Sequence, residues 1–127
     1  MRLVISLALC LLAGSAMASM PSTMRKSLSL RVGAAAWVGT FAQHSKSCEP
    51  IGGGTNNTTK APALGEIRTT EQQPVVAKFS ISGACIGSHM LGTKVDYLAK
   101  AAGNDNFEFD VVFRNGTVHY IVTTTNR

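Results

Sequence analysis

The stretch that decides the fold is Phe107–Thr124, which reads F-E-F-D-V-V-F-R-N-G-T-V-H-Y-I-V-T-T. Apolar and polar residues alternate on both sides of Asn115-Gly116. An Asn-Gly pair between two alternating runs is the strongest short-range signal for a β-hairpin. We therefore predict two antiparallel strands joined by a two-residue loop at Asn115-Gly116.

The loop sets the register of this hairpin and the face that each side chain occupies. With Asn115-Gly116 as the loop, Phe113 lies opposite Val118. Side chains alternate between the two faces of a strand, so one face is apolar and is expected to meet the core. That face carries Phe107, Phe109, Val111, Phe113, Val118, Tyr120 and Val122. The other face is mixed and carries Glu108, Asp110, Val112, His119, Ile121 and Thr123.

Short strand-like segments recur before the hairpin and are separated by glycine and proline. We predict strands at Trp37–Phe41, Gly65–Thr69, Val75–Ile81 and Thr93–Tyr97. Six or seven short strands in about 100 residues are typical of a small antiparallel β-sandwich with one core. Trp37 is expected in that core. The glycine-rich segment Ile51–Asn57 is predicted to be a flexible loop.

The first residues have the pattern of an export signal. A basic Met1-Arg2 precedes an apolar run too short to span a membrane, and Ala16-Met17-Ala18 is a small-x-small cleavage site. We expect a signal peptide over residues 1–18, a flexible leader over residues 19–35 and a single domain over residues 36–127. An uncleaved anchor, or a short helix within the leader, is the alternative. The mature protein is expected to be periplasmic or secreted, without a membrane span.

Cleavage would leave two cysteines, Cys48 and Cys85. An even pair of cysteines in an exported protein predicts a disulfide. The paired C-x-x-C spacing of zinc sites is missing. The alternative is a catalytic cysteine that acts with His44 or His89.

The charge of the chain argues against nucleic-acid binding. It has 12 Lys and Arg against 7 Asp and Glu, and the basic residues are scattered along the sequence. Nucleic-acid-binding proteins normally concentrate basic residues in a stripe. The expected partner is a protein or an envelope polymer, and the positive net charge would attract anionic polymers weakly.

Four segments in order carry a resemblance to a known family. They are Pro62–Ile67 (P-A-L-G-E-I), Cys85–Gly87 (C-I-G), Gly92–Tyr97 (G-T-K-V-D-Y) and Gly103–Phe109 (G-N-D-N-F-E-F). This series resembles a family of bacterial exported Ig-like or cadherin-like domains, and Cys48 fits the earlier cysteine of that family. The match departs at Leu98–Ala102, where a proline and an aromatic residue are expected. The resemblance implies a small all-β, Ig-like antiparallel sandwich of about seven strands, from a family often without a known activity.

The Gly103–Phe109 segment also has a structural interpretation from its own residues. Gly103 suits a backbone conformation that other residues adopt at a steric cost. Asp105 is expected to accept hydrogen bonds from nearby backbone amides and so to hold the turn. The alternative is a calcium site that combines Asp105 with Asp96, Glu108 or Asp110, since calcium prefers convergent oxygen ligands.

The function expected from these observations is a non-enzymatic structural or interaction module of the bacterial envelope. No cofactor, metal or catalytic residue is predicted for it. The rival hypothesis is a small periplasmic enzyme or metal-binding protein that uses His44, His89 and Asp96. Convergence of these three side chains in one pocket would favour the rival, and dispersed positions would favour the module.

Overall fold

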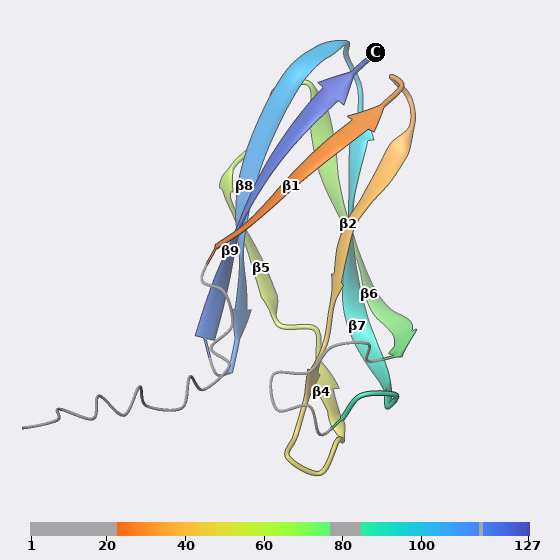
Figure 1. Ribbon diagram of the computed structural model, residues 1–127, viewed down its shortest axis with the longest axis vertical. Coiled ribbons are helices and arrows are strands. Elements are labelled where there is room, and N and C mark those ends of the chain that lie inside the picture. Colours follow the sequence, from red (N-terminus) through yellow and green to blue (C-terminus); the bar gives the residue numbers. More distant parts are fainter. Residues whose placement is uncertain (1–22, 77–84, 115) are drawn as a thin grey trace, which may run out of the picture.

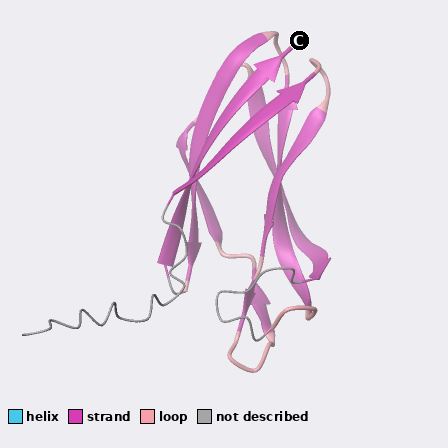
Figure 2. Ribbon diagram, viewed as in Figure 1, coloured by secondary structure: helices cyan, strands magenta, loops and turns pink. Residues whose placement is uncertain are grey.

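The computed structural model describes residues 23–76, 85–114 and 116–127, and all regular structure in this part of the chain is β-strand. Two sheets lie against each other in a sandwich-like arrangement (Figures 1 and 2). The strands are β1 (Thr23–Leu30), β2 (Ala35–Phe41), β3 (Gln43–His44), β4 (Pro50–Gly52), β5 (Thr55–Lys60), β6 (Gly65–Val76), β7 (His89–Ala99), β8 (Gly103–Phe113) and β9 (Gly116–Asn126). Within these described ranges no helix is long and apolar enough to cross a membrane.

The strand order is β1-β9-β8-β5 in one sheet and β2-β7-β6 in the other. The short strands β3 and β4 pair with each other at one end of the sandwich (Figure 1). β1 runs parallel to β9, and the other pairs are antiparallel. The all-β prediction is therefore confirmed.

The predicted hairpin forms, but its register differs by two residues from the prediction. Phe113 pairs with Gly116 and Val111 pairs with Val118, so the pair that closes the hairpin lies one residue earlier on each strand than predicted. A shift of two residues leaves every side chain on its predicted face, because side chains alternate with a period of two. Phe107, Phe109 and Val122 are accordingly buried on the inner face.

Aromatic rings from both sheets fill the core between them. Tyr97 of β7 stacks on Phe107 of β8, with 5.2 Å between the ring centroids. Phe41 of β2 meets Tyr120 of β9 edge-on at 5.1 Å, and Tyr120 stacks on Phe109 at 5.0 Å. Such offset and edge-to-face pairs stabilise a core beyond the area that they bury.

The prediction of a flexible leader over residues 19–35 is wrong for Thr23–Leu30, which form β1, and no helix forms there. Leu28 and Leu30 face the core, while the residues between them and on either side are exposed. β1 pairs along its whole length with β9, which is almost 100 positions away in the sequence. β9 supplies the backbone hydrogen bonds that make these residues a strand. The local composition did not predict this pairing.

Two further predictions on strands and loops need correction. Thr55–Asn57, assigned to a flexible loop, belong to β5 and pair with β8. The separately predicted strands at Gly65–Thr69 and Val75–Ile81 are both part of one strand, β6, as far as Val76. Residues 77–81 of the second prediction lie outside the described part.

Trp37 is not a core residue, because 56% of its surface is exposed. A bulge between Trp37 and Gly39 leaves Val38 without a register partner in β7 and turns the tryptophan outward. The ammonium group of Lys26 on β1 lies 4.8 Å from the centroid of the Trp37 ring and donates a hydrogen bond to the carbonyl of Val38. Lys26 thereby links the edges of the two sheets.

Candidate functional site

Three chain connections gather at one end of the sandwich, which we call the disulfide end (the lower end in Figure 1). They are the β2–β5 connection, which contains β3 and β4, the described residues 85–88 of the β6–β7 connection, and Arg114 of the β8–β9 turn. Loops on a rigid sandwich commonly carry the binding residues of such a fold. This end is therefore the first candidate for a recognition surface.

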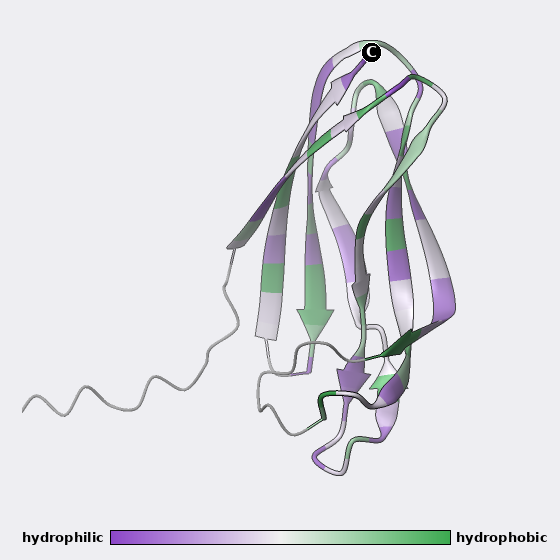
Figure 3. Ribbon diagram, turned by 45° about the vertical axis from the view of Figure 1, so that its right-hand side comes forward, coloured by the Kyte–Doolittle hydropathy of each residue, from purple (hydrophilic) through white to green (hydrophobic). Residues whose placement is uncertain are grey.

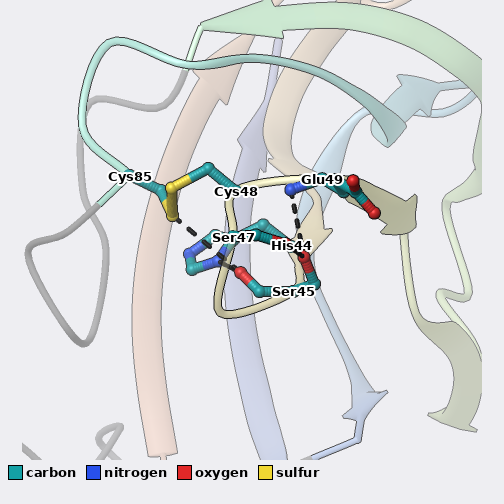
Figure 4. The surroundings of a disulfide bond; sticks show 6 residues. All are labelled: His44, Ser45, Ser47, Cys48, Glu49 and Cys85. Atoms are coloured by element: carbon teal, nitrogen blue, oxygen red, sulfur yellow. Dashed lines mark hydrogen bonds between the residues drawn. A yellow bond between two sulfur atoms is a disulfide. The ribbon is translucent and has the colours of Figure 1, made fainter.

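A disulfide between Cys48 and Cys85 joins the first two of these connections (Figure 4). The two Cα atoms lie 5.4 Å apart and the sulfur atoms 2.09 Å apart. This geometry is consistent with the predicted bond. Only 1% of the surface of Cys85 is exposed.

A tight turn presents Cys48 to its partner. The amide of Cys48 donates to the carbonyl of Ser45 at 3.0 Å. The amide of Glu49 donates to the Ser45 hydroxyl at 3.1 Å (Figure 4). Nδ1 of His44 also donates to the Ser45 carbonyl, at 2.9 Å. Cys48 itself has a φ of 65°, a conformation that few non-glycine residues adopt. The disulfide and these hydrogen bonds together hold the turn in place.

The third connection is tied to the first by one hydrogen bond. The backbone amide of Arg114, in the β8–β9 turn, donates to Oε1 of Gln43 at 2.7 Å. A covalent bond and a side-chain hydrogen bond therefore link all three connections of the disulfide end.

Exposed apolar side chains concentrate at this end. Among the described residues, seven large apolar side chains are strongly exposed, and four of them lie here. These four are Ile51, Val76, Ile86 and Leu91. Figure 3 colours the last residues of β6 and the segment after residue 84 as hydrophobic. Several exposed apolar side chains at one end are more informative than single ones, which are normal on any surface.

Asp105 lies at the opposite end of the sandwich and is buried, with 6% of its surface exposed. Its Oδ1 accepts from the amides of Ala63 and Asn106, and its Oδ2 accepts from the amide of Leu64, each at 2.9 Å. The Tyr97 hydroxyl also donates to Oδ2, at 2.8 Å. Burial raises the pKa of Asp105, but the hydrogen bonds from Ala63, Leu64 and Tyr97 outweigh it and hold the pKa below its usual value.

The predicted role of Asp105 as an acceptor of amide hydrogen bonds agrees with these contacts, although most of its partners are distant in sequence. Two of its three amide donors come from the β5–β6 turn rather than from its own turn. Its two oxygens accept four hydrogen bonds, so the lone pairs that could bind a calcium ion are already occupied. Gly103 has a φ of 130°, and a Cβ atom there would lie 2.9 Å from Cδ1 of Leu64. Both observations fit the predicted structural role of Gly103.

A polar network around Asp105 was not foreseen from the sequence. Nδ2 of Asn126 donates to the Tyr97 hydroxyl at 2.8 Å and to the carbonyl of Ala101 at 3.1 Å. Thr124 completes the chain with a 3.0 Å hydrogen bond to Oδ1 of Asn126. These groups stabilise the packing of β7 against β8 and β9, because buried polar groups are tolerated only when they are paired.

The three residues of the rival hypothesis do not come together. His89 and Asp96 are both on β7, seven positions and about 23 Å apart along the strand. Asp96 forms an ion pair of 3.4 Å with Lys94, and His44 lies in the short strand β3. Within the described ranges no group of three His, Cys, Asp or Glu side chains is arranged to hold a metal ion.

The sequence pattern also did not predict the surroundings of His119. This residue lies between two carboxylates on the outer face of the β8–β9 hairpin. Nδ1 of His119 lies 2.5 Å from Asp110, and its Nε2 lies 2.8 Å from Glu108. Hydrogen bonding to Asp110, and then to Glu108, raises the pKa of His119. A neutral imidazole has only one N–H, so only the protonated ring can donate to both carboxylates.

Comparisons with protein-family models, with curated proteins and with solved structures found no match to this chain. The function is therefore inferred from the chemistry and geometry of the described residues. Their main features are a disulfide-linked set of loops, a structural polar network and a flanked histidine.

Proposed function

We propose that this protein is a non-enzymatic interaction module of the bacterial envelope that recognises its partner with the disulfide end. The observation that carries this proposal is that described residues of three connections at that end are linked by the Cys48–Cys85 bond and the Gln43–Arg114 hydrogen bond. Loops that are fixed before binding lose less conformational entropy when a partner binds.

We also propose that the sandwich is of the Ig-like type. Strands β2, β7 and β6 follow the order of strands B, E and D of that fold, and strands β9, β8 and β5 follow the order G, F and C. The disulfide end then corresponds to the end that carries the B–C and F–G loops, which antibodies use for recognition. This analogy supports the choice of surface, but a sandwich by itself does not define a function.

Export to the periplasm or the medium is part of the proposal. A disulfide in a small domain is typical of proteins that fold in an oxidising compartment. The signal-like pattern of residues 1–18 supports the same destination.

A partner protein is favoured over an envelope polymer as the ligand of the disulfide end. The exposed side chains of Ile51, Ile86 and Leu91 suit an apolar contact, and interface centres are depleted in charged residues. The enzyme or metal-binding alternative lacks comparable support, because its three residues are spread over β3 and both ends of β7.

Cross-linking and pull-down from an envelope extract test the proposal. The oxidised protein should capture a specific partner, and Ile86→Asp should abolish this capture. Val32→Asp is the matched control, because Val32 is 44% exposed but lies at the opposite end of the sandwich. Equal loss with both variants, or unchanged capture by Ile86→Asp, would show that the disulfide end is not the recognition surface. Capture of no partner by the parent would contradict the interaction role itself.

A further inference from the structure

The two sheets have four edge strands, and these edges are not equally protected. β1 and β5 flank one sheet, and β2 and β6 flank the other. An edge strand presents unpaired backbone N–H and C=O groups that another chain can extend, so proteins usually block it with charges, bulges or proline. The four edge strands differ in which of these protective features they have.

Three of the edges carry such devices. On β1, Lys26 points inward between the sheets, and its hydrogen bond to Val38 occupies a carbonyl of the β2 edge. β6 has a bulge between Thr70 and Gln73, followed by Pro74, which lacks an N–H group. Glu66 near the start of β6 forms 2.6 Å ion pairs on this strand and with the residue after β7.

β5 is the exception. Its first five residues, Thr55–Thr59, contain no charge and no proline, and Thr55–Thr58 pair with β8 in regular register. The only irregularity comes at the end of the strand, between Thr58 and Lys60. Every residue of β5 except Asn56 is exposed. In the described part of the chain, its outer edge hydrogen-bonds to no other strand.

A polar depression of about 250 Å³ lies between the edges of β5 and β6. Its lining residues are Gly54, Thr55, Asn56, Thr69, Glu71 and Thr93. It continues into a neighbouring depression of about 230 Å³ that shares Gly54, Glu71 and Thr93. A groove therefore runs beside the first residues of β5, which lack these protective features.

Asn56, one of the residues that line this groove, has a buried side-chain oxygen without a hydrogen-bond partner among the described residues. Oδ1 of Asn56 is fully buried and accepts no hydrogen bond, and it is the only such side-chain atom among the described residues. A buried acceptor without a donor costs about 1–3 kcal/mol, so its presence needs an explanation. A ligand that brings a hydrogen-bond donor to this oxygen would explain it.

The chemistry of the groove selects the ligand. Its lining offers the Asn56 amide oxygen, the Glu71 carboxylate and threonine hydroxyls, and it contains no basic residue. A cationic side chain with several N–H donors complements this set. The ammonium group of lysine and the guanidinium group of arginine are the candidates that a protein partner can provide.

We propose that the free edge of β5 receives an extended segment of a partner protein as an added strand, with a lysine or arginine side chain of that segment in the groove against Asn56 and Glu71. Backbone hydrogen bonds to β5 supply affinity, and the groove supplies specificity, as in other cases of strand addition. This inference rests on the proposed interaction role and adds the class of partner and a second contact surface.

Ten-residue peptides displayed on phage and selected against the oxidised protein provide the probe. The selected peptides should carry a lysine or an arginine. When a synthetic copy binds, hydrogen exchange should slow at β5 amides and not at β1 amides. Thr58→Lys, which gives β5 the same inward charge that Lys26 gives β1, should abolish binding.

Two groove variants separate recognition from folding. Asn56→Leu should bind the peptide at least about tenfold more weakly without lowering the melting temperature, because it removes an acceptor that has no partner in the free protein. Glu71→Gln should weaken binding about fivefold, as expected for an exposed charge pair. Glu66→Gln is the matched control on the same strand and should leave binding unchanged.

Several outcomes would overturn the inference. They are selection of no peptide, selection of peptides without a basic residue, binding without protection of β5, and equal effects of Glu66→Gln and Glu71→Gln. Dimerisation of the protein that Thr58→Lys abolishes would show that the edge pairs with a second copy instead. If Asn56→Leu captures the envelope partner normally while Ile86→Asp does not, the β5 inference fails and the proposed function stands.

Discussion

The hydroxyl of Tyr97 on β7 donates a 2.8 Å hydrogen bond to the carboxylate of Asp105 on β8, and both residues are buried. The bond crosses from one sheet to the other, because β7 and β8 belong to different layers. The same carboxylate accepts from two amides of the β5–β6 turn. Asp105 therefore joins both sheets and the turn between them.

Asp105→Ala should be the most damaging single substitution of a polar residue at this end. It leaves the amides of Ala63 and Leu64 and the Tyr97 hydroxyl without their acceptor, so the free energy of unfolding should fall by about 3 kcal/mol. Urea titration measures this change. Asp96→Ala is the control, because the partly exposed ion pair of Asp96 with Lys94 is expected to contribute less than about 1 kcal/mol. A loss at Asp105 no larger than at Asp96 would contradict the role of the network.

His119 should titrate above the usual histidine range of about 6.5. The raised pKa means that its contribution to stability is fully present below pH 6.5 and is lost as the pH rises through the folded pKa. NMR titration of the ring protons measures this midpoint. Replacing Glu108 by Gln and Asp110 by Asn together should lower it, and Asp96→Asn on the other sheet should not. An unchanged midpoint in the double variant would mean that the carboxylates do not hold the protonated ring in solution.

The same hairpin shows what the sequence can and cannot predict. Alternation alone was enough to assign Phe107, Phe109 and Val122 to the buried face. The register depended on the choice of loop, and two registers that differ by two residues bury the same face. The predicted register placed His119 opposite Val112 rather than Asp110. The contact between His119 and the two carboxylates could therefore not be predicted.

Other features depend on partners that are distant in the sequence. β1 and β5 are strands because β9 and β8 pair with them, and Asn56 and Asn57 in β5 carry little strand signal of their own. Asp105 could be predicted to accept amide hydrogen bonds because of its residue type. Its donors at Ala63 and Leu64, about 40 positions earlier, could not. The cysteine pair could be predicted because the expected cleavage would leave only two cysteines, Cys48 and Cys85.

Replacing Cys48 and Cys85 together by Ser should leave the domain barely stable. The bond closes a loop with a sequence separation of 37, which is worth about 4 kcal/mol in the chain-entropy model. Typical domains are stable by only about 5–15 kcal/mol. Thermal unfolding of the parent and the double variant tests this expectation, and thiol labelling of the non-reduced parent provides the control. Two reactive thiols in the parent, or an equal melting temperature in both proteins, would contradict it.

The exported protein should begin at Ser19. Ala16 and Ala18 provide the small side chains that signal peptidase recognises, so cleavage is expected after Ala18. Intact-mass measurement of the protein from the envelope fraction gives the position directly. Exchange of Ala18 for a bulky residue should leave the precursor uncleaved. A mature protein that retains residues 1–18 would contradict the proposed export route.

Lys26→Ala should loosen the edge where β1 meets β2. It removes the hydrogen bond to the Val38 carbonyl and the contact with the Trp37 ring, so the free energy of unfolding should fall by about 1–2 kcal/mol. Trp37 is the only tryptophan, so its fluorescence reports on this contact and on unfolding in the same experiment. The emission of the folded variant should change because the ammonium group no longer covers the ring.

Arg25→Ala is the matched control for this prediction. Arg25 precedes Lys26 on β1 but is exposed on the opposite face, so removal of its charge should alter neither stability nor fluorescence. Loss of the inward charge should also make Lys26→Ala more prone to associate through its edges than Arg25→Ala, which sedimentation at increasing concentration would measure. Equal behaviour of the two variants would show that the net charge of β1, rather than the link between Lys26 and the β2 edge, maintains this side of the sandwich.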